Sequence, residues 1–66
     1  MRGIFYDRTA LRLHLVEGAP HPEWTLISHN LEATPNQCRR VLRELLTIED
    51  LARVDWSGVS GRARAA

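Results

Sequence analysis

The sequence predicts a mainly α-helical fold in which three helices are followed by a small β-hairpin. Three stretches carry apolar residues at the spacing of one helix face, and residue types that begin or end helices flank them. After the third stretch, apolar and polar residues alternate as they do in a half-buried strand, and two glycine-containing turns follow. With 66 residues, of which 44 % are apolar and 26 % charged, the chain is predicted to form one folded domain over residues 1–66.

The first helix is predicted over about residues 8–17. Asp7 or Thr9 can cap its start, because short polar side chains accept hydrogen bonds from the free N–H groups of a first helical turn. Gly18 follows the last apolar residue and is a common helix end. Its apolar residues are Ala10, Leu11, Leu13, Leu15 and Val16. His14 lies among the leucines and is interpreted as a packing residue.

A stiff connection separates this helix from a second one over about residues 23–31. The connection is Ala19-Pro20-His21-Pro22, in which the prolines and the residues before them disfavour helix. Trp24, Ile27 and Leu31 then recur at a helical spacing. Two short helices are therefore predicted rather than one long helix.

The third helix is predicted over residues 35–46 and has two different faces. Thr34 is a good N-cap, and Pro35 occupies the first helical position, where its missing N–H costs no hydrogen bond. The apolar face carries Cys38, Val41, Leu42 and Leu45, and the opposite face carries Asn36, Gln37, Arg39, Arg40 and Arg43. Cys38 is the only cysteine, so it is interpreted as a small buried hydrophobe. The polar face has the residue types that bond phosphates and base edges.

A small hairpin is predicted over about residues 51–65. Its first strand is Leu51-Ala52-Arg53-Val54-Asp55-Trp56, in which apolar and polar residues alternate. Ser57-Gly58 and Ser60-Gly61 are turn signals, and a basic return strand would carry Arg62 and Arg64. A frayed tail is the alternative interpretation of the last residues.

Residues 26–45 resemble, without gaps, the helix-turn-helix of winged-helix bacterial regulators. A small residue, Ser28, stands in the middle of the first helix of the pair, Leu31 precedes the turn, and Thr34 caps the recognition helix. The ending Val41-Leu42-Arg43-Glu44-Leu45 is similar to the usual end of that helix. The resemblance implies a three-helix winged helix-turn-helix of the small bacterial or phage regulator type, with the hairpin as its wing.

The function predicted from these features is binding of double-stranded DNA through residues 35–45, as a small transcriptional or replication regulator. The candidate base-reading residues are Asn36, Gln37 and Arg40; the candidate phosphate-binding residues are Thr34, Arg39 and Arg43; and Arg62 and Arg64 would touch the backbone or the minor groove. Binding is expected to depend strongly on salt. Because one copy makes few base contacts, specificity requires a homodimer or a protein partner, for which the exposed part of residues 1–6 is a candidate contact.

The alternative function is protein binding, in which a winged-helix scaffold recognises another protein. A small phage- or plasmid-encoded inhibitor of a host complex would be an example. The net charge of only +1 favours this alternative, as do Glu49, Asp50 and Asp55, which lie close to the predicted wing and would repel phosphate.

No catalytic arrangement is visible in the sequence, so the chain is not predicted to be an enzyme. Its three histidines are scattered, its acids form no plausible catalytic pair, and it contains no glycine-rich phosphate loop. No metal or cofactor is predicted. The absence of a signal-peptide pattern and of a long apolar run leads us to expect a cytoplasmic protein without membrane contact.

Overall fold

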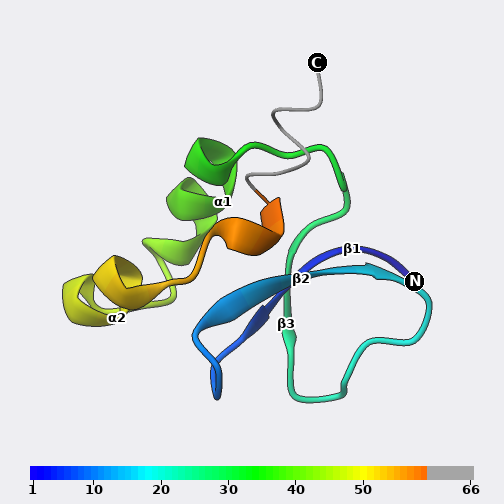
Figure 1. Cartoon of the computed structure of the whole chain (residues 1–66), viewed down its shortest axis with the longest axis horizontal. Coiled ribbons are helices and arrows are strands. Elements are labelled where there is room, and N and C mark those ends of the chain that lie inside the picture. Colours follow the sequence, from blue (N-terminus) through cyan, green and yellow to red (C-terminus); the bar gives the residue numbers. More distant parts are fainter. Residues whose placement is uncertain (60–66) are drawn as a thin grey trace.

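The computed structural model describes residues 1–59 and shows a three-stranded antiparallel β-sheet followed by two short helices (Figure 1). The strands are β1 (Arg2–Asp7), β2 (Arg12–Glu17) and β3 (Thr25–Ser28), and they lie in the order β2-β1-β3. The helices are α1 (Pro35–Leu42) and α2 (Ile48–Arg53). The predicted mainly α-helical fold, a three-helix winged helix-turn-helix, is therefore wrong, because the sheet is the principal element of the described chain.

The first predicted helix, residues 8–17, is instead the turn and second strand of the β1–β2 hairpin. Asp7 forms the turn, because its Oδ1 accepts hydrogen bonds from the backbone N–H groups of Thr9 at 3.0 Å and Ala10 at 3.2 Å. In β2, Leu13 is buried between two more exposed neighbours, so the apolar residues follow the two-residue period of a strand. Pairing with β1 along all six positions outweighs the helix-like spacing of the leucines.

The second predicted helix, residues 23–31, is also wrong, because this segment contains β3 and the turn after it. The β-branched Ile27 suits a strand, and β3 pairs with the free edge of β1. Ser28 Oγ then accepts a hydrogen bond from Asn30 N–H at 3.0 Å, and Asn30 Oδ1 accepts one from Glu32 N–H at 2.8 Å. These local side-chain bonds end the strand and turn the chain towards α1.

The third helix begins where the sequence predicts it, and Thr34 is confirmed as its N-cap. Thr34 Oγ1 accepts a hydrogen bond from Gln37 N–H at 3.2 Å, while Gln37 Oε1 accepts one from Thr34 N–H at 2.9 Å. This reciprocal pair is a capping box. Regular helix ends at Leu42, earlier than the predicted residue 46, although hydrogen-bonded turns continue to Leu46.

The predicted first strand of the wing, within residues 51–65, is wrong, because its first three residues belong to α2. Thr47 Oγ1 caps α2 by accepting a hydrogen bond from Asp50 N–H at 3.1 Å. Asp55 makes only an isolated bridge beside the start of β2, with its N–H donating to Leu11 O at 2.8 Å, and residues 57–59 are helical. The rest of the predicted hairpin, including Arg62 and Arg64, lies outside the described residues.

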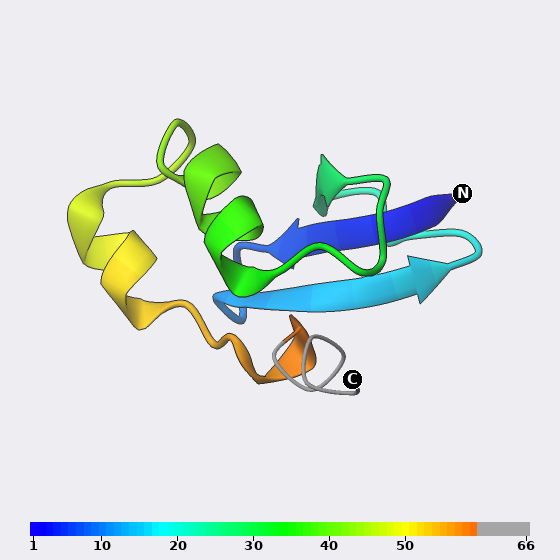
Figure 2. The same ribbon diagram turned by 90° about the horizontal axis from the view of Figure 1, so that it is seen from above.

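The core lies between one face of the sheet and the chain that follows it. Its buried residues are Ile4, Tyr6, Leu13, Ile27, Leu31, Ala33, Cys38, Leu42, Val54 and Val59. Phe5 is also buried but lies outside this cluster, because side chains alternate along β1 and its side chain points to the opposite face. Figures 1 and 2 show α1 over the sheet and α2 extending beyond it.

Loss of the Thr34 cap is expected to destabilise the domain. The Thr34→Ala substitution removes the oxygen that accepts from Gln37 N–H, and such losses cost about 1 kcal/mol of folding free energy. Chemical denaturation followed by circular dichroism measures the effect. Thr34→Ser keeps the acceptor oxygen and should remain close to wild type. Equal losses in the two variants would contradict the role of the hydroxyl.

Candidate nucleic-acid interface

The exposed side of α1 carries a basic face, defined here as Asn36, Arg39, Arg40 and Arg43. These residues follow the i, i+3, i+4, i+7 spacing, which brings side chains together along one side of a helix. All four are exposed, and together they line a surface hollow of about 280 Å³. The structure thus brings together four of the eight residues predicted to contact DNA.

Arg39 is held in place by an aromatic ring from the chain after α2. Its guanidinium carbon lies 5.2 Å from the centre of the Trp56 ring, the geometry of a cation–π contact. Trp56 is half-buried and packs against the core. The basic face therefore has one arginine with a restrained position, although the sequence gives no signal that Trp56 lies beside α1.

The arginines of the basic face form no salt bridge with any acidic group among residues 1–59. The contact of ion-pair length found in this part of the chain is the one between His14 Nε2 and Asp7 Oδ2, at 3.0 Å. Glu44 stands four residues after Arg40, a spacing that often gives an ion pair on a helix, yet no such pair forms here. The guanidinium groups of Arg40 and Arg43 are thus open to an anion from solution, and a phosphate oxygen fits their chemistry.

Thr34 and Gln37, also predicted to contact DNA, are engaged in capping the helix. Their side chains bond to each other's backbone N–H groups, so Thr34 Oγ1 and Gln37 Oε1 already have donors. Gln37 also borders a different hollow, between α1 and the chain around β3, which contains Ile27 and Ala33. These two residues fix the start of α1 rather than extend the basic face. The other two predicted contacts, Arg62 and Arg64, lie outside the described residues.

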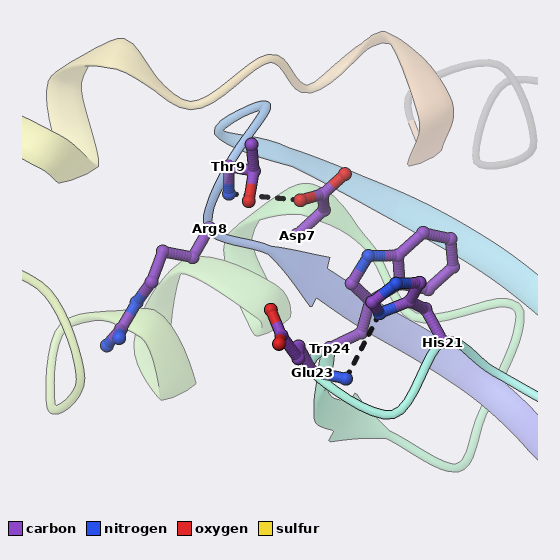
Figure 3. Close-up of a pocket in the computed structure, with 6 residues that line it drawn as sticks. All are labelled: Asp7, Arg8, Thr9, His21, Glu23 and Trp24. Carbon is purple, nitrogen blue, oxygen red and sulfur yellow. Dashed lines mark hydrogen bonds between the residues drawn. The ribbon is translucent and has the colours of Figure 1, made fainter.

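A second polar cluster, which sequence reasoning missed, lies around the β1–β2 turn and the chain before β3 (Figure 3). His14 Nε2 lies 3.0 Å from Asp7 Oδ2, and the His14 ring stacks on Trp24 with centroids 3.9 Å apart and planes 5° apart. His21 lies against Trp24 at 5.6 Å, and its Nδ1 accepts a hydrogen bond from Glu23 N–H at 3.1 Å. His14 is thus a packing residue as predicted, and its packing partner is an indole.

The hollow beside this cluster has a volume of about 570 Å³. It is lined by Asp7, Arg8, Thr9, His21, Glu23 and Trp24 (Figure 3). Its Trp24 ring already stacks with two imidazoles, and the Asp7 carboxylate already accepts three hydrogen bonds. Within residues 1–59, no three histidine, cysteine, aspartate or glutamate side chains are placed to hold a metal ion. We therefore interpret the cluster as packing that closes the β1–β2 turn.

The Asp7 contacts predict a pH dependence of stability. The hydrogen bond from His14, together with those from Ala10 and Thr9 N–H, holds the pKa of Asp7 below its usual value of 3.8. The folded state therefore binds a proton less readily than the unfolded state. Because the folded-state pKa is the lower one, this stabilisation is fully present above the unfolded-state pKa and is lost as pH falls through the folded-state pKa.

The Asp7→Asn variant should accordingly be less stable than wild type at about pH 6, and the difference should narrow as the pH falls to about 2.5. Urea denaturation of both proteins across this range measures the difference in unfolding free energy. Glu49→Gln is a suitable control, because Glu49 is exposed and removal of its charge affects no hydrogen bond found in the described chain. A difference that stays constant with pH would contradict the assignment of Asp7.

Comparison of the chain with protein-family models, curated protein sequences and solved structures found no match. Within residues 1–59, neither helix has the length and apolar character needed to cross a membrane. A functional assignment therefore depends on the geometry and charge of the chain itself.

Proposed function

We propose that the chain binds double-stranded DNA through the basic face of α1 and acts as a small transcriptional or replication regulator. The observation that carries the proposal is the exposed cluster of Asn36, Arg39, Arg40 and Arg43 around one hollow, with no acidic partner among residues 1–59. Guanidinium groups bind phosphate through paired N–H donors, which makes arginine more effective than lysine in this role. The net charge of +1 matters less than this local concentration of positive charge.

The size of α1 suits contact with a short stretch of duplex. The major groove of B-DNA is wide enough to admit one helix, and the eight residues of α1 extend over about 12 Å. Arg39 and Arg43 are assigned to phosphates, and Asn36 and Arg40, which line the same hollow, to base edges. A helix of this length covers about three base pairs, so the affinity of one copy comes mainly from contacts with the DNA phosphates.

Titration of the full chain on random-sequence duplex, followed by fluorescence anisotropy at several salt concentrations, tests the proposal. Wild type should bind at low salt, with log K falling linearly against log salt by about 0.9 for each phosphate neutralised. The double substitution Arg39→Ala/Arg43→Ala should weaken binding roughly tenfold or more and make the slope shallower by about 2. No binding at low salt would overturn the proposal.

The matched control is Arg2→Ala/Arg8→Ala, which removes two exposed positive charges from β1 and the turn after it. This variant should retain most of the affinity for duplex and nearly the whole slope of log K against log salt. Equal losses of affinity in the two double variants would show that the duplex is attracted by net charge alone. That result would contradict the assignment of the DNA-binding site to α1. Because Arg39 also contacts Trp56, circular dichroism must establish that its variant is folded.

Protein binding is the second candidate function, and the exposed apolar side chains of Val41 and Leu45, which line one hollow, favour it. Exposed aliphatic residues that lie together are typical of protein contacts. The same titration separates the two candidates: a folded chain that fails to bind duplex at low salt supports protein binding. Binding to duplex that depends on salt and is lost in Arg39→Ala/Arg43→Ala supports the proposed DNA-binding function.

A further inference from the structure

An apolar groove lies at the end of α1 and in the turns that follow it, and it is defined by Arg40, Val41, Glu44 and Leu45. The groove shares Arg40 with the basic face. The groove has a volume of about 360 Å³. Val41 is 38 % exposed and Leu45 51 % exposed, and the neighbouring Ile48 at the start of α2 is 86 % exposed. Burial of these three aliphatic side chains would be favourable, because each Å² of apolar surface removed from water contributes about 25 cal/mol of free energy.

The exposure of the groove results from the small size of the sheet. The sequence places Val41 and Leu45 in one apolar stripe with Cys38 and Leu42, yet the structure buries only the last two of these four. Figures 1 and 2 show that α2 lies beyond the strands and that the chain after it returns to the sheet, where Val54 and Val59 join the core. The apolar stripe is therefore wider than the surface that the sheet covers, and Val41 and Leu45 remain exposed.

The charges around the groove are complementary to a second copy of the groove. Arg40 and Glu44 lie beside the apolar residues, and neither forms a salt bridge within residues 1–59. Arg40 lies two residues before Leu42, where α1 ends, and Glu44 lies two residues after it, in the hydrogen-bonded turns that follow. If two α1 helices pack antiparallel about a twofold axis beside Leu42, Arg40 of each copy faces Glu44 of the other, while Val41 and Leu45 interleave between them. A twofold contact requires this kind of self-complementarity.

From these observations we propose that the chain forms a homodimer through antiparallel packing of its apolar groove on the same groove of a second copy. Arg39 and Arg43 do not line the groove, so the contact does not need the residues assigned to phosphate binding. Arg40 is shared by the groove and the basic face, so the dimer occupies one residue assigned to base contact but does not require DNA to form. A standard interface takes about 800 Å² from each partner, and a few residues of a chain exposing 4645 Å² supply less, so the dimer is weak and depends on concentration.

Sedimentation equilibrium without DNA tests the proposal. The average mass of wild type should rise from 7.5 kDa towards twice that value between about 10 µM and about 1 mM. Arg40→Glu and Glu44→Arg should each weaken association about tenfold or more, because each places like charges opposite one another. The double substitution Arg40→Glu/Glu44→Arg restores opposite charges and should restore association.

The control is Glu49→Arg, which makes the same charge change at an exposed position on α2 outside the groove and should still associate. A wild-type mass that stays at 7.5 kDa at the highest concentration would overturn the proposal. Failure of the double substitution to restore association would also overturn it, as would a mass that rises beyond that of a dimer. Because no DNA is present, a negative result here leaves the DNA titration unaffected.

Discussion

Replacing Leu42 with alanine is expected to leave the domain largely unfolded. Leu42 is 0 % exposed and lies in the core cluster, where α1 meets the sheet. A buried leucine shortened to alanine costs about 2–5 kcal/mol, because apolar contacts are lost and the cavity only partly collapses. A domain of 66 residues has about 3–10 kcal/mol of total stability, so this single loss removes most of it.

Urea denaturation and thermal melting followed by circular dichroism measure this loss. Leu45→Ala is a matched control, because it makes the same chemical change one turn later on a side chain that is 51 % exposed. The control should cost less than about 1 kcal/mol at concentrations too low for association, since less apolar surface is returned to water. If the two variants were equally stable, α1 would not be packed on the sheet through Leu42.

The start of α1 could be predicted because its determinants are local. Thr34, Pro35 and Gln37 occur at the spacing that a capped helix requires, and the structure forms the capping box that this spacing allows. The grouping of Asn36, Arg39, Arg40 and Arg43 follows from helical periodicity alone. The position of Gln37, three residues after Thr34, also predicts its role in the capping box. Its residue type, however, equally suits contact with a base.

The strands could not be predicted in the same way, because their determinants are non-local. The leucines at positions 11, 13 and 15 fit a strand as well as a helix, and the choice depends on β1 as a pairing partner. Residues 4–6 form a short apolar run that is buried in the central strand, where β2 pairs with one edge and β3 with the other. Without a partner, six residues carry too little pattern to classify.

The same limit applies to the cluster at the β1–β2 turn. Asp7 and His14 meet because the antiparallel register places Asp7 opposite Arg12, two residues before His14. Trp24 reaches His14 from a different part of the chain. His14 alone gives only the signal of a histidine among leucines. The candidate basic face was therefore accessible to sequence reasoning, whereas the packing that supports the sheet was not.

Replacement of Gly3 by alanine is the second substitution expected to be strongly destabilising. A Cβ at Gly3 would clash with the backbone carbonyl oxygen of Ser28 and would lie only 3.0 Å from Leu26 Cδ1. Backbone atoms cannot move aside as a flexible side chain can, so β1 and β3 would have to separate at their register shift beside Ile4. Overpacking of this kind costs about 1–3 kcal/mol or more.

Gly18→Ala provides the contrast, because a Cβ at Gly18 meets no atom within 4 Å and the backbone there has no positive φ. This variant should match or slightly exceed wild-type stability, by about 0.4–1 kcal/mol, since alanine restricts the unfolded chain more than glycine does. Urea denaturation of both variants gives the comparison. A large difference between them supports the close approach of β1 and β3, which only the sheet architecture requires. Equal stability of the two variants would mean that β3 does not lie against β1 at Gly3.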